Sequence, residues 1–479
     1  MNTPTLPINV PGLLAPVRTV HIENFRGVRD LAIDLDEHVT VFFGVNAAGK
    51  TSILDALAIG LGAYVTRVPK AKGLSFQKQG DIRVPWKKKL EWEETRGAER
   101  PYARVTITCA NGLKWDVHKL RWAGDRPGTP SVGLKQLHEA FDSLLKEALE
   151  GGEDAATTQP ALPLVAAYGT ERSVVALPLR KRDFNERFHR LGALDESLKT
   201  GTRFKAVFEW FVVAEDEERR ERERRKEFEY RLATLEWVRG AVTRAGLRCQ
   251  RPRIETKPNL RMLVDLEHSD GSLEEIDIAD LSDGYRTHFA LVVDIARRMV
   301  QLNPSDDLQS VDRGTNTEAV ILIDEIDLHL DPTWQASVVK GLRDAFPRAQ
   351  LVLTTHSEQV IGSVPASSVR KLVAGDGEVL VESVPFAEGA TSERILIELM
   401  GAKERAGQVA EGHNTKLLAA YMTLVSQGKG ASADAQNQRT ELEMALPGDE
   451  RLHQADLEMQ KQDLLRQIRG GRSEACSSA

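Results

Sequence analysis

The chain has 479 residues, of which 41% are hydrophobic and 28% charged, and its formal net charge is −7. This balance is typical of a globular protein of several domains; it shows no overall basic excess, although a local basic strip would suffice for contacts with nucleic acid. No apolar run approaches the roughly 20 residues of a membrane span, and the N-terminus lacks a signal-peptide pattern. The three cysteines (Cys109, Cys249 and Cys476) show no metal-ligand spacing and favour a reducing, cytoplasmic setting.

The first part of the chain alternates strand and helix patterns. After a flexible leader (1–16), residues 17–44 read as strands and a helix runs from Lys50 to about Leu61. Residues 66–100 are basic and poorly periodic, which predicts a long surface loop, whereas alternation around Asn111-Gly112 predicts a hairpin over 103–121. A helix (134–149), a disordered loop (151–160) and a buried strand in "LPLVAAYG" complete this N-terminal half, which we delimit as 17–202.

A charged insertion follows at 203–248. Its core, "EDEERRERERRKEFEYRLATLEWVR", predicts one long helix, either solvated and held by i,i+4 ion pairs or projecting as an arm for a partner. The segment 249–386 then predicts a hairpin over 261–280 and two apolar strands, "AVILID" and "AQLVLTTH", with a helix between them. Such alternation indicates a parallel, doubly wound sheet. The remainder, 387–479, is polar and predicted to be helical, with a disordered tail at "GGRSEACSSA".

A phosphate-binding loop is the most specific motif. "GVNAAGKTS" (44–52) fits G-x-x-x-x-G-K-[ST] and lies between an apolar strand and a helix. Gly44 and Gly49 allow the backbone to wrap a phosphate, Lys50 supplies a charge to the β- and γ-phosphate oxygens, and the hydroxyl of Thr51 suits Mg²⁺. The predicted nucleotide-binding residues of this loop are Gly44, Asn46, Ala47, Ala48, Gly49, Lys50, Thr51 and Ser52.

Two later strands end in groups suited to the same chemistry. Asp324 ends the first and is predicted to hold Mg²⁺, and Glu325 beside it is suited to polarise an attacking water as general base. Asp327 and His329 are either catalytic or loop-stabilising. His356 follows the second strand, where it could hydrogen-bond the γ-phosphate.

The stretch "LSDGYRT" (281–287) precedes an apolar helix pattern and has two readings. Ser282 or Asp283 is an N-cap of that helix, or the helix N-terminus is aimed at a phosphate. Seen alone, the stretch favours the cap.

The order of these motifs resembles the ATP-binding-cassette ATPases. "LSDGYRT" is similar to their L-S-G-G-Q signature, and Ser282 and Gly284 keep the two positions that contact ATP in that family, while Asp283 and Tyr285 depart from it. "IENFRGVRDLAIDL" with "NAAGKTSILDAL" is similar to the SMC, RecF and OLD branch. "LSDGYRTHFALVVDIARR" with "LIDEIDLHLDPTWQ" resembles the PtuA-like ATPases of Septu and retron anti-phage systems, which work with an HNH nuclease.

The resemblance implies an α/β fold of the ABC/SMC-head type: a parallel sheet core, an antiparallel β subdomain, a helical insertion and a helical C-terminal region. It implies ATP and Mg²⁺ as cofactors, Lys50, Glu325 and His356 as catalytic residues, and Thr51 and Asp324 as metal ligands. It also implies an ATP-sandwich dimer in which Ser282 and Gly284 contact the nucleotide of the other copy. The family's glutamine loop has two candidates, Gln79 and the stretch 168–172, of which the second follows a buried strand as in the family.

Three functions remain open. The chain is an ATPase that controls a partner nuclease, a nucleotide-stabilised scaffold that holds a nuclease inhibited with little turnover, or a RecF- or SMC-like DNA-repair ATPase. Basic clusters at 68–89 and 248–261 could contact DNA or other nucleic acid, though solvated loops are an alternative. Residues 387–479 carry no D-x-D cluster, so we expect no nuclease activity in this chain and read that region as a docking surface or a plain helical extension.

Overall fold

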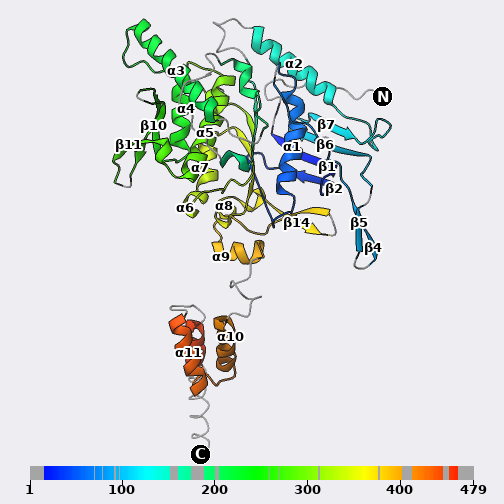
Figure 1. Cartoon of the computed structure of the whole chain (residues 1–479), viewed down its shortest axis with the longest axis vertical. Helices are drawn as coiled ribbons and strands as arrows, with labels where there is room; N and C mark the ends of the chain where they lie inside the picture. The colour runs from blue at the N-terminus through cyan, green and yellow to red at the C-terminus, as the bar shows by residue number, and fades with distance from the viewer. Residues whose placement is uncertain are drawn as a thin grey trace, which may run out of the picture. The chain divides into compact units, whose positions relative to one another are not determined.

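A computed structural model describes residues 14, 16–69, 71–77, 79–90, 93–96, 98–150, 160–173, 188–199, 204–257, 259–268, 270–310, 313–375, 378–401, 413–445 and 452–461. The chain divides into two compact units, Met1–Ile395 and Leu396–Ala479 (Figure 1). Among the described residues, no helix has the length and apolar character that crossing a membrane requires. The predicted loop at 151–160 and the predicted tail at 470–479 lie outside the described residues, apart from Pro160.

The core of the first unit is a mixed sheet that, within the described residues, has six strands in the order β15-β14-β3-β13-β12-β8. All neighbours pair in parallel except β14 and β15. Every residue of β3, β8, β12 and β13 is buried, because helices cover both faces of the sheet. The predicted parallel sheet is therefore confirmed. Its strands are β3 (Val39–Phe43), β8 (Leu164–Tyr168), β12 (Ala319–Ile323), β13 (Ala349–Thr355), β14 (Val369–Gly375) and β15 (Glu378–Ser383).

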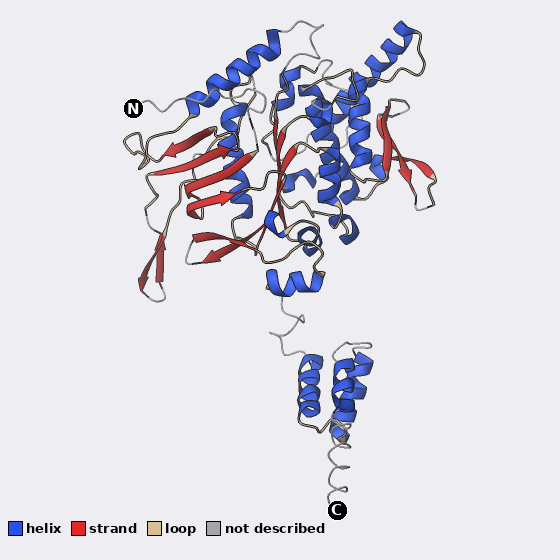
Figure 2. Ribbon diagram, turned by 180° about the vertical axis from the view of Figure 1, so that it is seen from behind, coloured by secondary structure: helices blue, strands red, loops and turns tan. Residues whose placement is uncertain are grey.

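One face of this sheet is covered by α1 (Lys50–Val65), which also packs against an antiparallel sheet in the order β2-β1-β6-β7 (Figure 2). The indole nitrogen of Trp115 donates to the carbonyl oxygen of Gly60 at 2.9 Å. A Cβ at Gly60 would meet the side chain of Ile107 at 2.8 Å, so glycine permits this close approach. The hairpin predicted at Asn111-Gly112 is present. The elements are β1 (Val17–Phe25), β2 (Val28–Asp34), β6 (Tyr102–Cys109), β7 (Lys114–Leu120) and the adjoining α2 (Leu134–Glu150).

The segment 66–100 differs from the prediction of a loop, since it contains the hairpin of β4 (Trp86–Leu90) and β5 (Glu93–Arg96). The sequence of this hairpin has little apolar alternation. Strand formation there depends on pairing, which periodicity does not report.

The prediction of a single long helix in the charged insertion is also wrong. The chain forms α3 (Phe204–Arg225) and α4 (Ala233–Arg244), and Lys226 between them has a φ of 56°. The guanidinium of Arg222 donates to the carbonyl oxygen of Tyr230 at 2.8 Å, and the backbone nitrogen of Leu232 donates to the carboxylate of Glu218 at 2.8 Å. These contacts replace helical hydrogen bonds and fix the turn.

The other face of the mixed sheet is covered by a group of helices around α5 (Figures 1 and 2). Tyr168 of β8 hydrogen-bonds Asp294 of α5 at 2.9 Å, and Asp294 also forms ion pairs with Arg297 and Arg298. This buried network fixes α5 against the sheet. The elements on this side are β9 (Cys249–Glu255), β10 (Arg261–Glu267), β11 (Leu273–Asp277), α5 (Asp283–Leu302), α6 (Pro332–Gln335), α7 (Val338–Ala345) and α8 (Glu358–Gly362).

Short helical turns complete the first unit, and they are η2 (Thr170–Ser173), η3 (Arg190–Leu194), η4 (Ile278–Asp280), η5 (Gly314–Asn316), η6 (Ala366–Ser368) and α9 (Ser392–Arg394); the π-helical turn η7 (Ile395–Leu399) follows α9. The second unit contains α10 (His413–Ser426), α11 (Ala433–Ala445) and a helical segment at 452–461. Its own buried cluster consists of Leu418, Tyr421, Val425, Ala435, Leu442, Leu452 and Ala455.

Candidate nucleotide site

The predicted phosphate-binding loop follows β3 and opens α1. Its backbone takes left-handed conformations at Ala47 (φ 65°) and Gly49 (φ 97°), and backbone turns of this kind can direct neighbouring N–H groups toward one anion. No side chain caps the N-terminus of α1, so the N–H groups of its first turn are available to an anion. A Cβ at Gly44 would meet the carbonyl oxygen of Leu372 at 2.5 Å, which explains glycine at the start of the loop. This backbone suits a phosphate.

Lys50 reaches back over the loop from the first turn of α1. Its ammonium donates to the carbonyl oxygens of Gly44 at 2.9 Å and Val45 at 3.4 Å. Burial lowers the pKa of Lys50, while the charges of Asp324 and Glu325 oppose this shift. Lys50 is thus held beside the loop by groups that a phosphate can replace.

Thr51 and Asp324 lie side by side although 273 residues separate them in the sequence. The hydroxyl of Thr51 donates to one oxygen of Asp324 at 2.8 Å, and the hydroxyl of Thr354 donates to the other at 2.5 Å. A hydroxyl and a carboxylate are hard oxygen donors of the kind that Mg²⁺ prefers together with substrate phosphates. No group of three or more His, Cys, Asp or Glu positioned to hold a metal occurs among the described residues, so the ligands besides Thr51 and Asp324 would be phosphate oxygens and water. The donor set fits magnesium.

Glu325 adopts a strained backbone conformation at this edge of the sheet. Its φ is 49°, and its backbone nitrogen donates to the hydroxyl of Thr354 at 2.7 Å. No hydrogen bond or ion pair within the described part of the chain engages its carboxylate. Positive φ at a residue other than glycine costs free energy and is concentrated at functional sites. The arrangement leaves a carboxylate ready to accept a proton from water.

Arg172 is predicted from the sequence only as the last residue of the candidate glutamine loop 168–172, and the structure gives this residue a role of its own. Its guanidinium, 2% exposed, donates to the carbonyl oxygens of Gly169 (2.8 Å), Asp324 and Glu325. Burial lowers the pKa of Arg172 to about 10, although the nearby carboxylates favour its charged form. Arg172 therefore holds the backbone of the acidic pair in place. It belongs to the stretch 168–172, the second candidate for the glutamine loop, whereas Gln79 is exposed.

Asp327 stabilises the loop after β13. Its carboxylate accepts hydrogen bonds from the hydroxyl of Thr355 at 2.6 Å and from the backbone nitrogen of His356 at 3.3 Å. This geometry favours the loop-stabilising reading of Asp327. It also fixes the backbone from which the half-buried side chain of His356 projects at the carboxyl edge of the sheet.

The stretch "LSDGYRT" forms the N-terminus of α5 and is satisfied within the chain. Ser282 is the N-cap, and its exposed hydroxyl accepts from the backbone nitrogen of Tyr285 at 3.4 Å. Asp283 pairs with Arg286 one turn on. A Cβ at Gly284 would lie 2.0 Å from the carbonyl oxygen of His329, so the helix start packs tightly against the loop that follows Glu325. The capping reading is therefore observed, and it leaves Ser282 exposed.

The predicted residues fall into two groups. The phosphate loop, Asp324, Glu325 and His356 share the carboxyl edge of β3, β12 and β13. Among the described residues, no hydrogen bond or ion pair joins Ser282, Asp283 or Gly284 to the loop 44–52. Within one chain, the signature and the phosphate loop are separate features.

Comparisons with known proteins agree with the motifs. A family model described as "AAA domain" matches residues 19–236, and another, "AAA domain, putative AbiEii toxin, Type IV TA system", matches residues 176–362. In an alignment of 511 positions, the chain is 26% identical to "Retron Ec83 probable ATPase" of Escherichia coli. The match covers 93% of the chain and 86% of the relative.

Other relatives match over shorter segments. "Retron Vc95 probable ATPase" of Vibrio cholerae is 34% identical over 37% of the chain and 32% of the relative. "Septu protein PtuA" of Bacillus mycoides is 40% identical over 22% of the chain and 13% of the relative. A solved structure, the "SmcHead bound to the C-winged helix domain of ScpA", is similar with a TM-score of 0.44 and 15% identity over 77% of this chain and 98% of that chain. The predicted resemblance to the ATPases of retron and Septu systems is confirmed by these matches. The predicted parallel sheet core with an antiparallel β subdomain is confirmed by the strand order.

Proposed function

We propose that this chain, an SMC/RecF-like ATPase related to the ATPases of retron and Septu systems, hydrolyses ATP in sites that two copies build together. The observation that supports this most directly is the hydroxyl–carboxylate cluster of Thr51, Asp324 and Thr354 beside the phosphate loop. The signature belongs to a different part of the same chain and offers an exposed serine. A two-fold arrangement supplies each phosphate loop with the signature of the other copy.

The residues of the phosphate-loop side have distinct roles. The backbone N–H groups at the start of α1 and the ammonium of Lys50 bind the β- and γ-phosphates. Thr51 and Asp324 would hold Mg²⁺, which would neutralise charge on the phosphate oxygens. Glu325 accepts a proton from the attacking water while the water oxygen bonds to the γ-phosphorus. The bond between the γ-phosphorus and the bridging oxygen breaks, which gives ADP and phosphate. His356 contacts the γ-phosphate.

The signature side completes the site from the second copy. Ser282 and Gly284 present the N-terminus of α5, whose partial positive charge suits the γ-phosphate held by the partner. ATP then joins the two copies, and hydrolysis releases them.

Glu325→Gln tests this mechanism. The amide cannot accept the proton, so we expect phosphate release to fall by about 10²- to 10⁴-fold while ATP binding persists and an ATP-bound dimer accumulates. Light scattering with and without ATP measures the dimer, and phosphate release measures turnover. Glu318→Gln is the matched control, because Glu318 immediately precedes the other end of β12 and pairs with Arg348. Single-turnover hydrolysis at the wild-type rate would rule out Glu325 as the base.

We further propose that the ATPase cycle controls a nuclease encoded beside it, of the HNH type, through the helices of the second unit. The names of the relatives support a role in defence, and the second unit has its own buried core and therefore a surface of its own. The test is purification with the product of the neighbouring gene, followed by a nuclease assay with and without ATP. If the Glu325→Gln variant still controls the nuclease normally, ATP binding alone is sufficient for control. If the chain does not associate with the product of the neighbouring gene, this part of the proposal is contradicted.

A further inference from the structure

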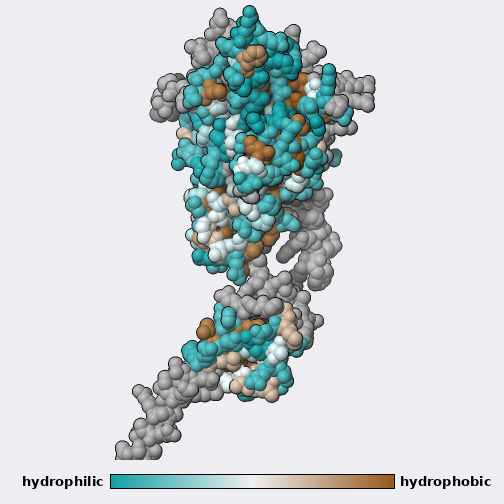
Figure 3. Space-filling view, turned by 90° about the vertical axis from the view of Figure 1, so that its left-hand side faces the viewer, coloured by the Kyte–Doolittle hydropathy of each residue, from teal (hydrophilic) through white to brown (hydrophobic). Residues whose placement is uncertain are grey.

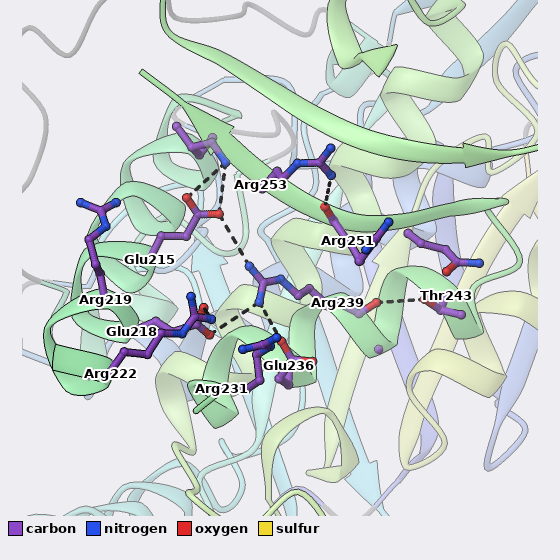
Figure 4. A pocket seen from close by; sticks show the side chains of 13 residues that line it. Glu215, Glu218, Arg219, Arg222, Arg231, Glu236, Arg239, Thr243, Arg251 and Arg253 are labelled. Carbon is purple, nitrogen blue, oxygen red and sulfur yellow. Dashed lines mark hydrogen bonds and ion pairs between the residues drawn. The ribbon is translucent and has the colours of Figure 1, made fainter. Parts of the chain in front are cut away.

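A large hollow lies outside the nucleotide site, between α3, α4 and β9 (Figure 4). Its volume is about 760 Å³, and it opens on a face of the first unit that is predominantly hydrophilic (Figure 3). Of the residues that the structure describes, those lining it are Glu215, Glu218, Arg219, Arg222, Arg231, Glu236, Arg239, Gly240, Thr243, Gln250, Arg251, Arg253 and Ile254. Arginine dominates this lining.

Arg239 organises the floor of the hollow. Its guanidinium lies 2.7 Å from Glu236, 3.6 Å from Glu218 and 3.7 Å from Glu215, and Figure 4 shows it at the centre of these carboxylates. Three carboxylates thus surround one guanidinium, so the floor itself offers an anion no net positive charge. The charge available to a ligand comes from the remaining arginines.

Glu215 contributes less negative charge than its position suggests. Both of its carboxylate oxygens accept from the backbone nitrogen of Ile254, at 3.1 and 3.2 Å, which ties α3 to β9. Burial raises the pKa of Glu215 to about 7, against the opposing effect of that hydrogen bond and of Arg239. Near neutral pH a part of the molecules carries a protonated Glu215, and the lining is then more positive.

The arginines at the rim are exposed, and two of them, Arg219 and Arg231, pair with exposed carboxylates. The side chains of Arg219, Arg231 and Arg251 are 67%, 45% and 69% exposed. Their acidic partners, Asp216, Glu229 and Asp265, do not line the hollow. Because exposed ion pairs stabilise a protein by about 0–1 kcal/mol, a multiply charged anion can compete for the guanidinium groups of Arg219 and Arg231, whereas Arg251 is held by the buried Asp265.

The chemistry of the lining selects the ligand. Guanidinium groups from three different elements can share the oxygens of tetrahedral phosphates, which they bind in pairs of parallel hydrogen bonds. Among the described lining residues, no aromatic side chain offers a stacking surface for a base, and Ile254 is the one large apolar side chain. Recognition of the phosphates alone, without the bases, fits this surface.

We propose that the hollow between α3, α4 and β9 binds closely spaced phosphate groups, supplied by a nucleic-acid strand or by a free oligophosphate. This binding does not depend on ATP hydrolysis, since the phosphate loop and its acidic partners form another site.

The test measures binding of a short oligothymidylate and of inorganic tripolyphosphate to the full chain. Both probes are measured in a Lys50→Ala background, which weakens capture by the phosphate loop. Arg219→Gln with Arg231→Gln removes two rim charges and leaves Arg239, its glutamates and the pair of Arg251 with Asp265 in place. The control, Arg224→Gln with Arg225→Gln, removes two comparably exposed charges of α3 that do not line the hollow.

We expect the rim variant to bind the probe at least about tenfold more weakly and to lower the salt-dependence slope by about one for each lost contact. If tripolyphosphate does not displace the bound oligothymidylate, the phosphates come from a nucleic-acid strand. If tripolyphosphate itself binds and the rim variant weakens its binding to the same extent, they come from a free oligophosphate. Equal binding by the rim variant and the control overturns the proposal. The proposal is also overturned if a polyglutamate peptide binds more tightly than either phosphate probe and loses this binding in the rim variant.

Discussion

The phosphate-loop side and the signature side of the proposed ATP site are built differently. On the first side, Thr51, Asp324 and Thr354 form a chain of short hydrogen bonds, and the buried Arg172 clamps the backbone of Asp324 and Glu325. On the second side, Ser282 caps its own helix and remains exposed.

This difference shows which contacts fix each side of the proposed ATP site. The phosphate-loop side is fixed by contacts between strands far apart in the sequence, and its geometry is complete before any partner binds. The signature side is positioned by the close approach of Gly284 to the loop at His329, but its cap is local. A ligand can therefore replace the cap of α5 at little cost, whereas the loss of a clamp on the other side disturbs the whole edge of the sheet.

Arg172→Met breaks the first side and has the largest expected effect on stability. The carbonyl oxygens of Gly169, Asp324 and Glu325 lose their buried donor, so we expect the free energy of unfolding to fall by about 2–4 kcal/mol and turnover to fall with it. Denaturant unfolding and phosphate release measure both. Arg104→Met, in the outer antiparallel sheet, is the control: it removes the buried partner of Glu23 and should lower stability while the ATP affinity of the folded protein stays unchanged. Equal turnover in the two variants would contradict a clamping role for Arg172.

His288→Gln tests the helix that carries the signature. Burial and the charge of Arg172 lower the pKa of His288 to about 4, and its ring packs near Trp334. The folded state holds this ring neutral while the unfolded chain binds a proton below about pH 6.5. The free energy of unfolding should therefore be intact above that pH and fall by up to about 3 kcal/mol as the pH drops to about 4.

The measurement for this prediction is denaturant unfolding across that pH range. The glutamine variant should lose this part of the pH dependence, and the same substitution at the exposed His38 controls for the removal of a histidine. A pH profile of His288→Gln that coincides with the wild-type profile would show that His288 does not titrate in this way.

Asp283→Asn has the smallest expected effect. The carboxylate is 72% exposed and pairs with Arg286 on the surface, so its loss should change the free energy of unfolding by less than about 1 kcal/mol. Because the carboxylate flanks the proposed phosphate contact, ATP-dependent dimerisation should be at least as tight as in the wild type. Weaker dimerisation in the variant would show that Asp283 makes a favourable contact with the partner.

The sequence was most informative where local patterns and the fold coincide. The strand before "GVNAAGKTS" and the apolar strands before Asp324 and His356 predicted the sheet and the group of residues at its carboxyl edge, since parallel buried strands bring their ends together. The hairpin at Asn111-Gly112 followed from its turn, where Gly112 has a φ of 84°.

Other features depend on contacts that no local pattern reports. Arg172 has its role because its guanidinium meets the carbonyl oxygens of residues more than 150 positions away. The break between α3 and α4 depends on side chains, those of Glu218 and Arg222, that replace backbone partners. A charge-rich sequence with good helix propensity conceals such a turn. Of the hollow at Arg239, only the basic cluster at 248–261 could be identified from the sequence. Two of the three elements that line the hollow, α3 and α4, come from a segment that was predicted to be one helix.

The central claim is that each ATP site is shared by two copies, and mixing two inactive variants tests it most directly. Lys50→Ala disables the phosphate loop, and Ser282→Arg is expected to bind nucleotide but not turn it over, because the bulky side chain blocks the signature. In a mixed dimer, the intact loop of one copy meets the intact signature of the other. Equal amounts should then restore about a quarter of wild-type phosphate release, since half of the dimers are mixed and each has one intact site. A mixture no more active than the two variants measured separately would contradict the account.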